Sequence, residues 1–336
     1  MMLFLGGTGP AYNANMLYEY GYNRLFSFAS HINAVDIAID RRKLMELFLA
    51  GIGSERDRLV KEVFNCNGLY SYEYDKKMWN KLRIGGKIFI DSGAFSAWTQ
   101  GIIIDTDQYI KWLNQRSDFI YLCGQVDAIP NSISEVKKAA EKTWKNYLYM
   151  RQKLNNPDSL LYTFHVGEPI NFLDRALSYT DDTGKYIPYI ALGGMVGKSV
   201  QTRRNFLTMV FNTIKKSPNP DVKVHTFGMT DKRLLEEFPI TSTDSTAWVI
   251  VAAMGGVMTD MGVTIVTENR LGDLNHYNRF PDNILNKFRA EVEEFGFTLG
   301  ELSVSRDKRA IHNARYMWDR ISKIVYKPQI KRKVLF

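Results

Sequence analysis

Residues 87–95 read KIFIDSGAF, and this stretch decides the fold. Three apolar residues lead directly to Asp91, and Ser92 and Gly93 follow as a turn. A short apolar run that ends in Asp, Ser or Gly is typical of a buried strand in a parallel sheet. Amphipathic stretches such as 132–154 and 200–216 separate the runs, so the sequence predicts an α/β protein with a TIM-type (β/α)8 barrel. The predicted strands are Met2–Gly6, Leu25–Ala29, Lys87–Asp91, Phe119–Val126, Leu161–Val166, Pro188–Leu192, Lys223–Phe227 and Ile240–Thr243.

The predicted organisation is a catalytic barrel domain over 1–253 and an extension over 254–336. An insert after the second strand, residues 35–86, is expected to form a surface excursion. Residues 254–278 are rich in Met, Gly, Thr and Asn and are predicted to form a long irregular loop beside the barrel mouth. Residues 281–325 carry apolar residues at helical spacing, and a basic tail follows.

Composition and charge limit the function classes. The net charge of +8 permits a polyanionic partner such as nucleic acid, although a basic protein without such a partner is equally consistent with it. No apolar run is long enough to span a membrane, and we expect no membrane association. The two cysteines, Cys66 and Cys123, allow at most one disulfide and have no zinc-binding spacing, so a reducing cytoplasm is expected. The oligomeric state is not predicted.

Aspartates follow three of the predicted strands. Asp91 ends the third strand, Asp127 follows the fourth and Asp244 follows the eighth. In a TIM barrel the carboxyl ends of the strands carry the reacting groups, so these three carboxylates should meet at one mouth. The competing interpretation for each is a helix N-cap, because Asp is a common capping residue.

Further candidate substrate contacts come from the same strand ends. His165 and Glu168 follow the fifth strand, and Gly193 and Gly194 after the sixth either present bare backbone to a flat ligand or form a tight turn. His225 lies earlier in its strand, and an interior histidine is the favoured interpretation there. The other predicted substrate-binding residues are Ser92, Gly93, Phe95, Gln125 and Met195.

Three strings, FIDSGAFSAW over 89–98, ALGGMVGKS over 191–199 and STDSTAW over 242–248, resemble the tRNA-guanine transglycosylase (queuine tRNA-ribosyltransferase) superfamily. The likeness is greatest to its phage-type DNA 7-deazaguanine transglycosylase branch and spans roughly residues 87–248. The resemblance implies that Asp244 is the nucleophile, that Asp91 is the acid/base and that Asp127 reads the base edge. Gly193 and Gly194 would line the base pocket. At the fifth strand the tRNA enzymes carry Gln-Gly-Gly, whereas this chain has a different sequence there, so no one-to-one match is made.

The predicted function is exchange of guanine in DNA for a 7-deazaguanine such as 7-cyano-7-deazaguanine (preQ0). Replacement of a base at C1′ passes through an oxocarbenium-like state that a carboxylate can trap covalently, and a second carboxylate can move protons. The guanine would be flipped out of a duplex or presented on a single strand. A phage-encoded protein would act in the host cytoplasm.

Two departures from the tRNA enzymes favour the DNA branch. Those enzymes carry a structural zinc site of three cysteines and a histidine after the barrel, whereas no cysteine follows Cys123, so no metal or other cofactor is expected. The Gly-Gly element is followed here by Met-Val-Gly-Lys. The predicted nucleic-acid contacts are Lys198, Lys327, Lys331, Arg332 and Lys333, although a solvated tail is the commoner explanation of such a run. Alternatives are the same exchange on tRNA, a non-catalytic nucleic-acid-binding relative, and a glycosidase that excises the base.

Overall fold

The computed structural model describes residues 45–50, 67–72 and 87–327. The described chain divides into two compact units. The barrel unit comprises the described residues up to 245 together with 321–327, and the second unit comprises 246–320.

The barrel unit is an α/β barrel of parallel strands. Each strand pairs with its neighbour in the chain, and β8 pairs back with β1. The alignment Phe48↔Asp244 fixes the register of that last pair. The strands are β1 (Glu46–Ala50), β2 (Asn67–Ser71), β3 (Ile88–Asp91), β4 (Leu122–Gly124), β5 (Leu160–His165), β6 (Tyr189–Gly193), β7 (Lys223–Thr226) and β8 (Ser242–Ser245).

The beginning of the barrel differs from the sequence prediction. The predicted strands Met2–Gly6 and Leu25–Ala29 lie outside the described residues. Strands β1 and β2 instead come from the segment 35–86, which we predicted to be an insert on the surface. The apolar residues around β1 are spaced as in a helix as well as in a strand, so their pattern does not single out a strand. Strand β2 is short and contains Gly68, which weakens its strand pattern.

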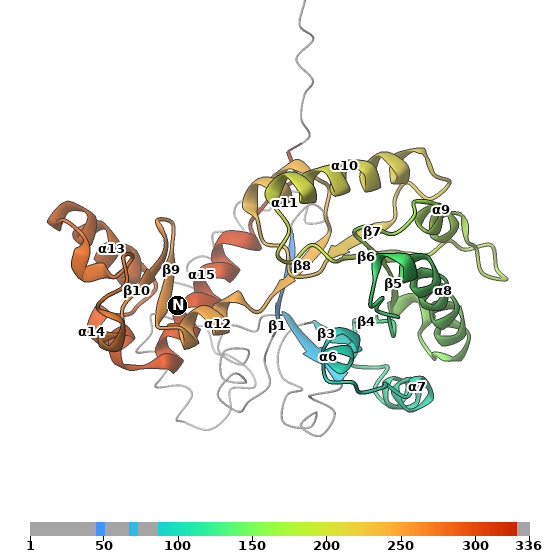
Figure 1. Cartoon of the computed structure of the whole chain (residues 1–336), viewed down its shortest axis with the longest axis horizontal. Coiled ribbons are helices and arrows are strands. Elements are labelled where there is room, and N and C mark those ends of the chain that lie inside the picture. The colour runs from blue at the N-terminus through green and yellow to red at the C-terminus, as the bar shows by residue number, and fades with distance from the viewer. Residues whose placement is uncertain (1–44, 51–66, 73–86, 328–336) are drawn as a thin grey trace, which may run out of the picture. The chain divides into compact units, whose positions relative to one another are not determined.

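Helices lie outside the strands, as the amphipathic patterns predict. Figure 1 shows α8, α9 and α10 around β5, β6 and β7. Helix α10 begins after Ser199, whose side chain accepts a hydrogen bond from the Thr202 N–H, and it buries Phe206, Val210 and Ile214. The barrel helices are α6 (Ala94–Thr99), α7 (Thr106–Asn114), α8 (Val136–Lys153), α9 (Asn171–Ser178), α10 (Val200–Lys216) and α11 (Lys232–Glu237), with 3-10 turns at Ile133–Glu135 and Pro157–Ser159.

The barrel interior is apolar toward the amino ends of the strands and polar toward their carboxyl ends. Phe48, Phe89, Leu122, Leu161 and Ala191 form the apolar cluster. Side chains alternate along a strand, so the inward positions that follow Phe89 and Leu161 are polar ones. This alternation carries Asp91 and His165 to the mouth.

Strand β4 also holds a buried thiol. Cys123 is 1% exposed, and its Sγ lies 3.5 Å from Ser159 Oγ. Burial raises the pKa of this thiol to about 12, although the contact with Ser159 acts in the other direction. Cys66 lies outside the described residues.

The second unit contains α12 (Ala247–Ala253), α13 (Asp282–Glu294), α14 (Leu299–Val304) and α15 (Arg306–Ile321). An antiparallel pair, β9 (Gly256–Thr259) and β10 (Gly262–Ile265), lies within the segment that we predicted to be an irregular loop. That prediction is wrong there, because Thr259 and Gly262 flank a two-residue turn and each arm carries β-forming residues, Val257 in one and Val263 in the other. Two 3-10 turns, Glu268–Arg270 and Tyr277–Arg279, follow.

Buried polar side chains of α15 hold the second unit together. The Arg309 guanidinium donates to the carbonyls of Ala252 and Leu302 at 3.0 and 2.7 Å. The Asn313 amide donates to the carbonyl of Gly256 and accepts from the Met258 N–H at 2.8 Å. In the described part of the chain, no helix is long and apolar enough to cross a membrane.

Candidate active site

Asp91 and Asp244 lie at the carboxyl ends of β3 and β8, and Asp127 lies in the loop after β4. None of the three caps a helix: α6 has Gly93 at its N-cap, α12 has Thr246, and the turn after Asp127 has Ser132. The capping interpretation therefore does not apply to these aspartates. Their shared position at one end of the barrel leaves the carboxylates available for chemistry.

Asp91 is held in a setting that favours its protonated form. Burial raises the pKa of Asp91 to about 7, and the charges of Asp127 and Asp244 add to the rise. A hydrogen bond of 3.0 Å from the Gly93 N–H to Oδ2 acts in the opposite direction. A carboxyl group with a pKa near neutrality can both give and take a proton at physiological pH.

Asp244 is oriented by two contacts on the same oxygen. Its Oδ1 accepts from the Gly228 N–H at 2.9 Å and lies 3.2 Å from His225 Nε2. Gly228 has a φ of 62°, a backbone conformation that disfavours side chains with a Cβ. Its loop is tied to β8 because Thr243 Oγ1 donates to the carbonyl of Met229 at 2.6 Å. The carboxylate is therefore fixed in orientation, with 10% of its side-chain surface exposed.

His225 joins the site through a contact that the sequence analysis did not predict. It is 0% exposed, as an interior histidine should be, yet it contacts Asp244 directly. The rings of Phe89 and Phe227 both lie 4.8 Å from its ring, centroid to centroid. The available signal was the strand register: His225 pairs with Ser242, so Asp244 lies two residues further on the same face.

Asp127 belongs to a second group in the mouth. Gln125 Nε2 donates to Asp127 Oδ1 at 2.9 Å, and His165 Nε2 lies 3.5 Å from Asp127 Oδ2. The other ring nitrogen of His165, Nδ1, lies 3.1 Å from Glu168 Oε1. Burial alone would lower the pKa of His165, but the two carboxylates outweigh it and raise this pKa to about 10. The histidine is thus an imidazolium between Asp127 and Glu168.

The loop that carries Asp127 is fixed by α8. The Ala128 N–H donates to Thr143 Oγ1 at 2.9 Å, and Asn146 Nδ2 donates to the Val126 carbonyl at 2.8 Å. Both residues lie near the middle of α8, three residues apart. These bonds position Asp127 through the backbone on both sides of it.

Gly193 at the end of β6 and Gly194 after it lie against His165. A Cβ at Gly193 would come within 2.5 Å of His165 Cδ2 and 2.8 Å of its Nε2. The His165 ring therefore occupies the space above Gly193. Gly194 begins the turn that follows, and Met195 is buried there at 1% exposure.

The remaining predicted substrate contacts follow β3. Ser92 is buried, and its Oγ accepts from the Ala94 N–H at 3.3 Å. Phe95 is 65% exposed on α6, with its ring centroid 6.0 Å from that of Trp98. The Trp98 indole N–H donates to Asn131 Oδ1 at 2.9 Å, which links α6 to the loop after β4. An exposed aromatic pair thus stands four and seven residues after Asp91.

The predicted nucleic-acid contacts are not brought together. Lys198 is exposed in the turn after β6, at the mouth. Lys327 pairs with Glu236 at 3.1 Å, near the end of α11, which leads to the amino end of β8. Residues Lys331, Arg332 and Lys333 lie outside the described residues.

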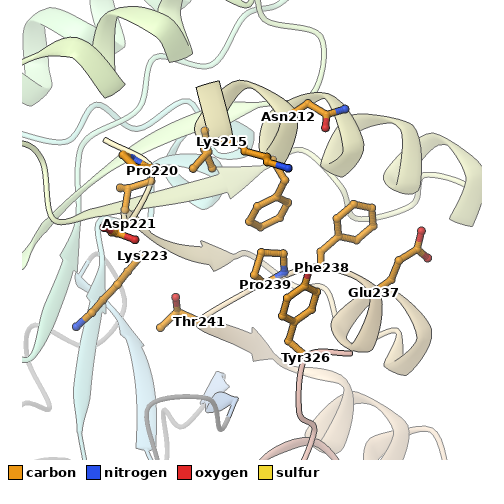
Figure 2. Close-up of a pocket in the computed structure, with 13 residues that line it drawn as sticks. Asn212, Lys215, Pro220, Asp221, Lys223, Glu237, Phe238, Pro239, Thr241 and Tyr326 are labelled. Atoms are coloured by element: carbon orange, nitrogen blue, oxygen red, sulfur yellow. The ribbon is translucent and has the colours of Figure 1, made fainter. Parts of the chain in front are cut away.

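A hollow of about 610 Å³ opens at the amino ends of β7 and β8, away from the aspartates. Figure 2 shows Phe238, Pro239 and Tyr326 gathered beside it, with Lys215 and Lys223 on its other side. Thr241 and Lys223 mark the starts of the two strands. This hollow contains none of the predicted site residues.

No protein-family model matches the chain, and a comparison with curated proteins finds no significant match. The functional interpretation therefore depends on the geometry of the mouth. Within residues 45–50, 67–72 and 87–327, no cluster of three or more His, Cys, Asp and Glu side chains is arranged to hold a metal ion.

Proposed function

We propose that the chain is a DNA guanine transglycosylase that exchanges guanine for a 7-deazaguanine base through a covalent aspartyl-glycosyl intermediate. The observation that carries the proposal is the pair Asp244 and Asp91 at strand ends of one barrel mouth. Asp244 is oriented through Oδ1 by Gly228 and His225, and the pKa of Asp91 is raised to about 7. An oriented carboxylate and a proton carrier are the two groups that base exchange needs.

The proposed first step forms one bond and breaks another. An Asp244 oxygen attacks C1′ of the sugar, and the C1′–N9 bond breaks with its electron pair going to guanine. The departing guanine takes the proton of the Asp91 carboxyl group. Because oxocarbenium-like states carry positive charge, an adjacent carboxylate also stabilises the path to the intermediate.

The second step reverses the first with a different base. The incoming 7-deazaguanine gives its N9 proton to the Asp91 carboxylate and attacks C1′, which releases Asp244. Protons balance over the cycle, and no cofactor takes part in it. Asp91 must be a base in this step and an acid in the previous one, for which a pKa near 7 is suitable.

Base recognition is assigned to Asp127 and Gln125. Gln125 Nε2 donates to Asp127, which leaves its buried Oε1 with no hydrogen-bond partner in the described structure. The Asp127 carboxylate and this carbonyl oxygen are both acceptors, and the amino and ring N–H groups of a guanine edge are donors. The match supports a guanine-type base rather than adenine, whose ring N1 is an acceptor.

The polymer is assigned as DNA on the resemblance stated above, with the guanine flipped out or on a single strand. The same exchange on tRNA is the main alternative. Incubation with radiolabelled guanine and either single-stranded DNA or tRNA separates them. Label that enters only tRNA would contradict the assignment to DNA.

Asp244→Asn is the variant that tests the chemistry. It keeps the side-chain shape but removes the nucleophile, so we expect exchange to disappear while polymer binding changes less than about twofold. The matched control is Asp182→Asn, an exposed aspartate on the loop before β6, which should exchange like the wild type. Wild-type protein that binds polymer without exchanging any guanine-type base would favour the non-catalytic relative. Abasic sites without insertion would indicate the base-excising glycosidase.

A further inference from the structure

We propose that Tyr189, Ser242 and His225 form a one-way hydrogen-bond relay inside the barrel that holds the His225 proton on Nε2 and selects Oδ2 of Asp244 as the attacking oxygen. The inference deepens the proposed function and rests on it only in giving Asp244 the attack. The three relay members are positioning residues, because they act through Asp244.

Three distances define the relay. Tyr189 Oη lies 2.7 Å from Ser242 Oγ, and Ser242 Oγ lies 2.8 Å from His225 Nδ1. The other ring nitrogen, Nε2, lies 3.2 Å from Asp244 Oδ1. The chain therefore runs from the first residue of β6 through β8 and β7 to the carboxylate at the mouth.

The chemistry of the carboxylate sets the direction of every proton. An ionised Asp244 only accepts hydrogen bonds, so His225 Nε2 must donate. In a neutral imidazole Nδ1 then accepts, and Ser242 is the donor to it. The Ser242 oxygen in turn accepts from Tyr189. Every hydroxyl and ring proton in this assignment has one acceptor, which leaves no buried donor without a partner.

Packing keeps the His225 ring in this orientation. Phe89 and Phe227 meet the ring nearly edge to face, at interplanar angles of 73° and 76°, and Phe48 lies 6.1 Å away on the same core. Tyr189 and Ser242 are 3% and 0% exposed, so water does not compete for the relay.

The relay makes the two oxygens of Asp244 different. Oδ1 is taken by His225 and by the Gly228 N–H. Oδ2 accepts no hydrogen bond from the described residues. Because hydrogen bonds reduce the electron density available for attack, the oxygen that bonds to C1′ is Oδ2. Rotation of the carboxylate, which would exchange the oxygens, requires both donors to be released.

Nitrogen-15 NMR of the resting protein tests the tautomer without any substrate. The chain has five histidines, so the His225 signals can be assigned with His225→Gln. We expect one pyridine-type nitrogen at Nδ1 and one pyrrole-type nitrogen at Nε2. A pyridine-type Nε2, or an imidazolium with two pyrrole-type nitrogens, would overturn the relay.

Two variants interrupt the relay at successive points. Ser242→Ala removes the donor to Nδ1 and should shift the Nδ1 resonance, whereas Tyr189→Phe should shift it less because Ser242 remains. The matched control is Tyr162→Phe: Tyr162 also buries its hydroxyl in a barrel strand, but that hydroxyl has no partner in the described structure. Equal shifts in Tyr162→Phe and Tyr189→Phe would contradict the relay.

Kinetics give the functional test. His225→Phe removes a hydrogen bond to a charged acceptor, and this should lower the rate of exchange by about 10- to 100-fold. We expect this loss in kcat with little change in the KM for the free base, and partial rescue in His225→Gln, whose amide can still donate toward Oδ1. Two outcomes would show that His225 only fills space. One is a rise in KM by the same factor in place of the fall in kcat, and the other is a His225→Gln variant that is as slow as His225→Phe at equal thermal stability.

The two tests separate the relay from the proposed function. A chain with the expected tautomer and Ser242→Ala response, but without exchange of any base, keeps the relay and loses the proposed function. A chain that exchanges bases but shows the wrong tautomer loses the relay alone.

Discussion

The carboxyl group of Asp91 lies near two other aspartates, and this neighbourhood sets its protonation. Burial is the larger cause of its raised pKa, and the charges of Asp127 and Asp244 are further causes. Removal of either neighbour should therefore lower the pKa of Asp91 toward its ordinary range. The acid and the nucleophile of the proposed reaction are electrostatically linked in this way.

We expect the rate of base release to fall above pH 7. The departing guanine needs the Asp91 proton, and this proton is lost as the pH passes about 7. Asp91→Asn should lower the rate by about 100- to 10,000-fold and remove this limb of the profile. Single-turnover measurements of guanine release between pH 5 and pH 9 check it. A wild-type limb that persists unchanged in the variant would exclude Asp91 as the acid.

The same shift affects stability with a defined sign. The folded protein holds the Asp91 proton up to about pH 7, whereas an unfolded chain loses it near the ordinary value of 3.8. The folded state therefore binds more protons in this window, and its stability falls as the pH rises from about 4 to 7. Asp91→Asn lacks this dependence. The free energy of unfolding of the variant minus that of the wild type, measured in urea, should therefore be larger at pH 8 than at pH 4.

At the scale of elements, β5 and β6 meet through His165 and Gly193. In Gly193→Ala the new Cβ would lie 2.5 Å from His165 Cδ2, so the ring must shift, and this should disturb its contact with Asp127. We expect a loss of stability of about 1–3 kcal/mol, as for overpacked sites, together with weaker binding of the free base.

The double variant isolates this clash. In a His165→Ala background the ring is absent, so Gly193→Ala should cost much less than it does in the wild type. Urea unfolding of the four proteins gives the coupling between the two positions. Additive losses would mean that Gly193 is required by its own backbone and not by the His165 ring.

Helix α6 presents Phe95 toward solvent close to Asp91. Exposed aromatic side chains stack with unpaired bases, and each such contact contributes about 1–3 kcal/mol. Phe95→Ala should therefore weaken binding of single-stranded DNA without lowering thermal stability, because Phe95 is 65% exposed. Tyr186→Ala, an aromatic residue 36% exposed before β6, is the control in fluorescence anisotropy. Equal effects of both variants would argue against stacking on α6.

Local pattern predicts those strands in which an apolar run leads into a polar end. Residues 87–91 and 223–227 were placed to within about one residue of β3 and β7, and the three aspartates were found because parallel strands end at one side. Strand β8 was predicted at Ile240–Thr243, whereas it runs over Ser242–Ser245. All four of its residues are buried although all are polar. Ser242, Thr243 and Asp244 make side-chain hydrogen bonds inside the barrel.

The partners of His225 could not be predicted in the same way. It stands between Val224 and Thr226 in a buried strand, and its contact with Asp244 depends on the register of two strands. Register between strands is set by long-range packing, which a local pattern does not contain. The prediction of the first two strands failed for a related reason, because β1 and β2 obtain their strand form from pairing with β8 and β3.

At the scale of the whole molecule, the net charge of +8 bears on polymer binding. Each lysine that neutralises a phosphate on single-stranded DNA releases about 0.7 of a counterion. Lys198→Ala should therefore lower the slope of log affinity against log salt by about 0.7, equally for all sequences. Lys185→Ala, on the loop before β6, is the matched control. Filter binding between 50 and 300 mM salt measures the slopes, and an unchanged slope in Lys198→Ala would remove this residue from the polymer path.

The buried thiol of Cys123 can serve as a probe of local opening of the barrel. A group with a pKa of about 12 and 1% exposure is inert to thiol reagents while β4 is paired on both sides. Chemical labelling of a Cys66→Ser protein would therefore proceed only through openings that break the sheet beside the Asp127 loop. The labelling rate with and without a guanine-type base would report how far an occupied mouth slows those openings.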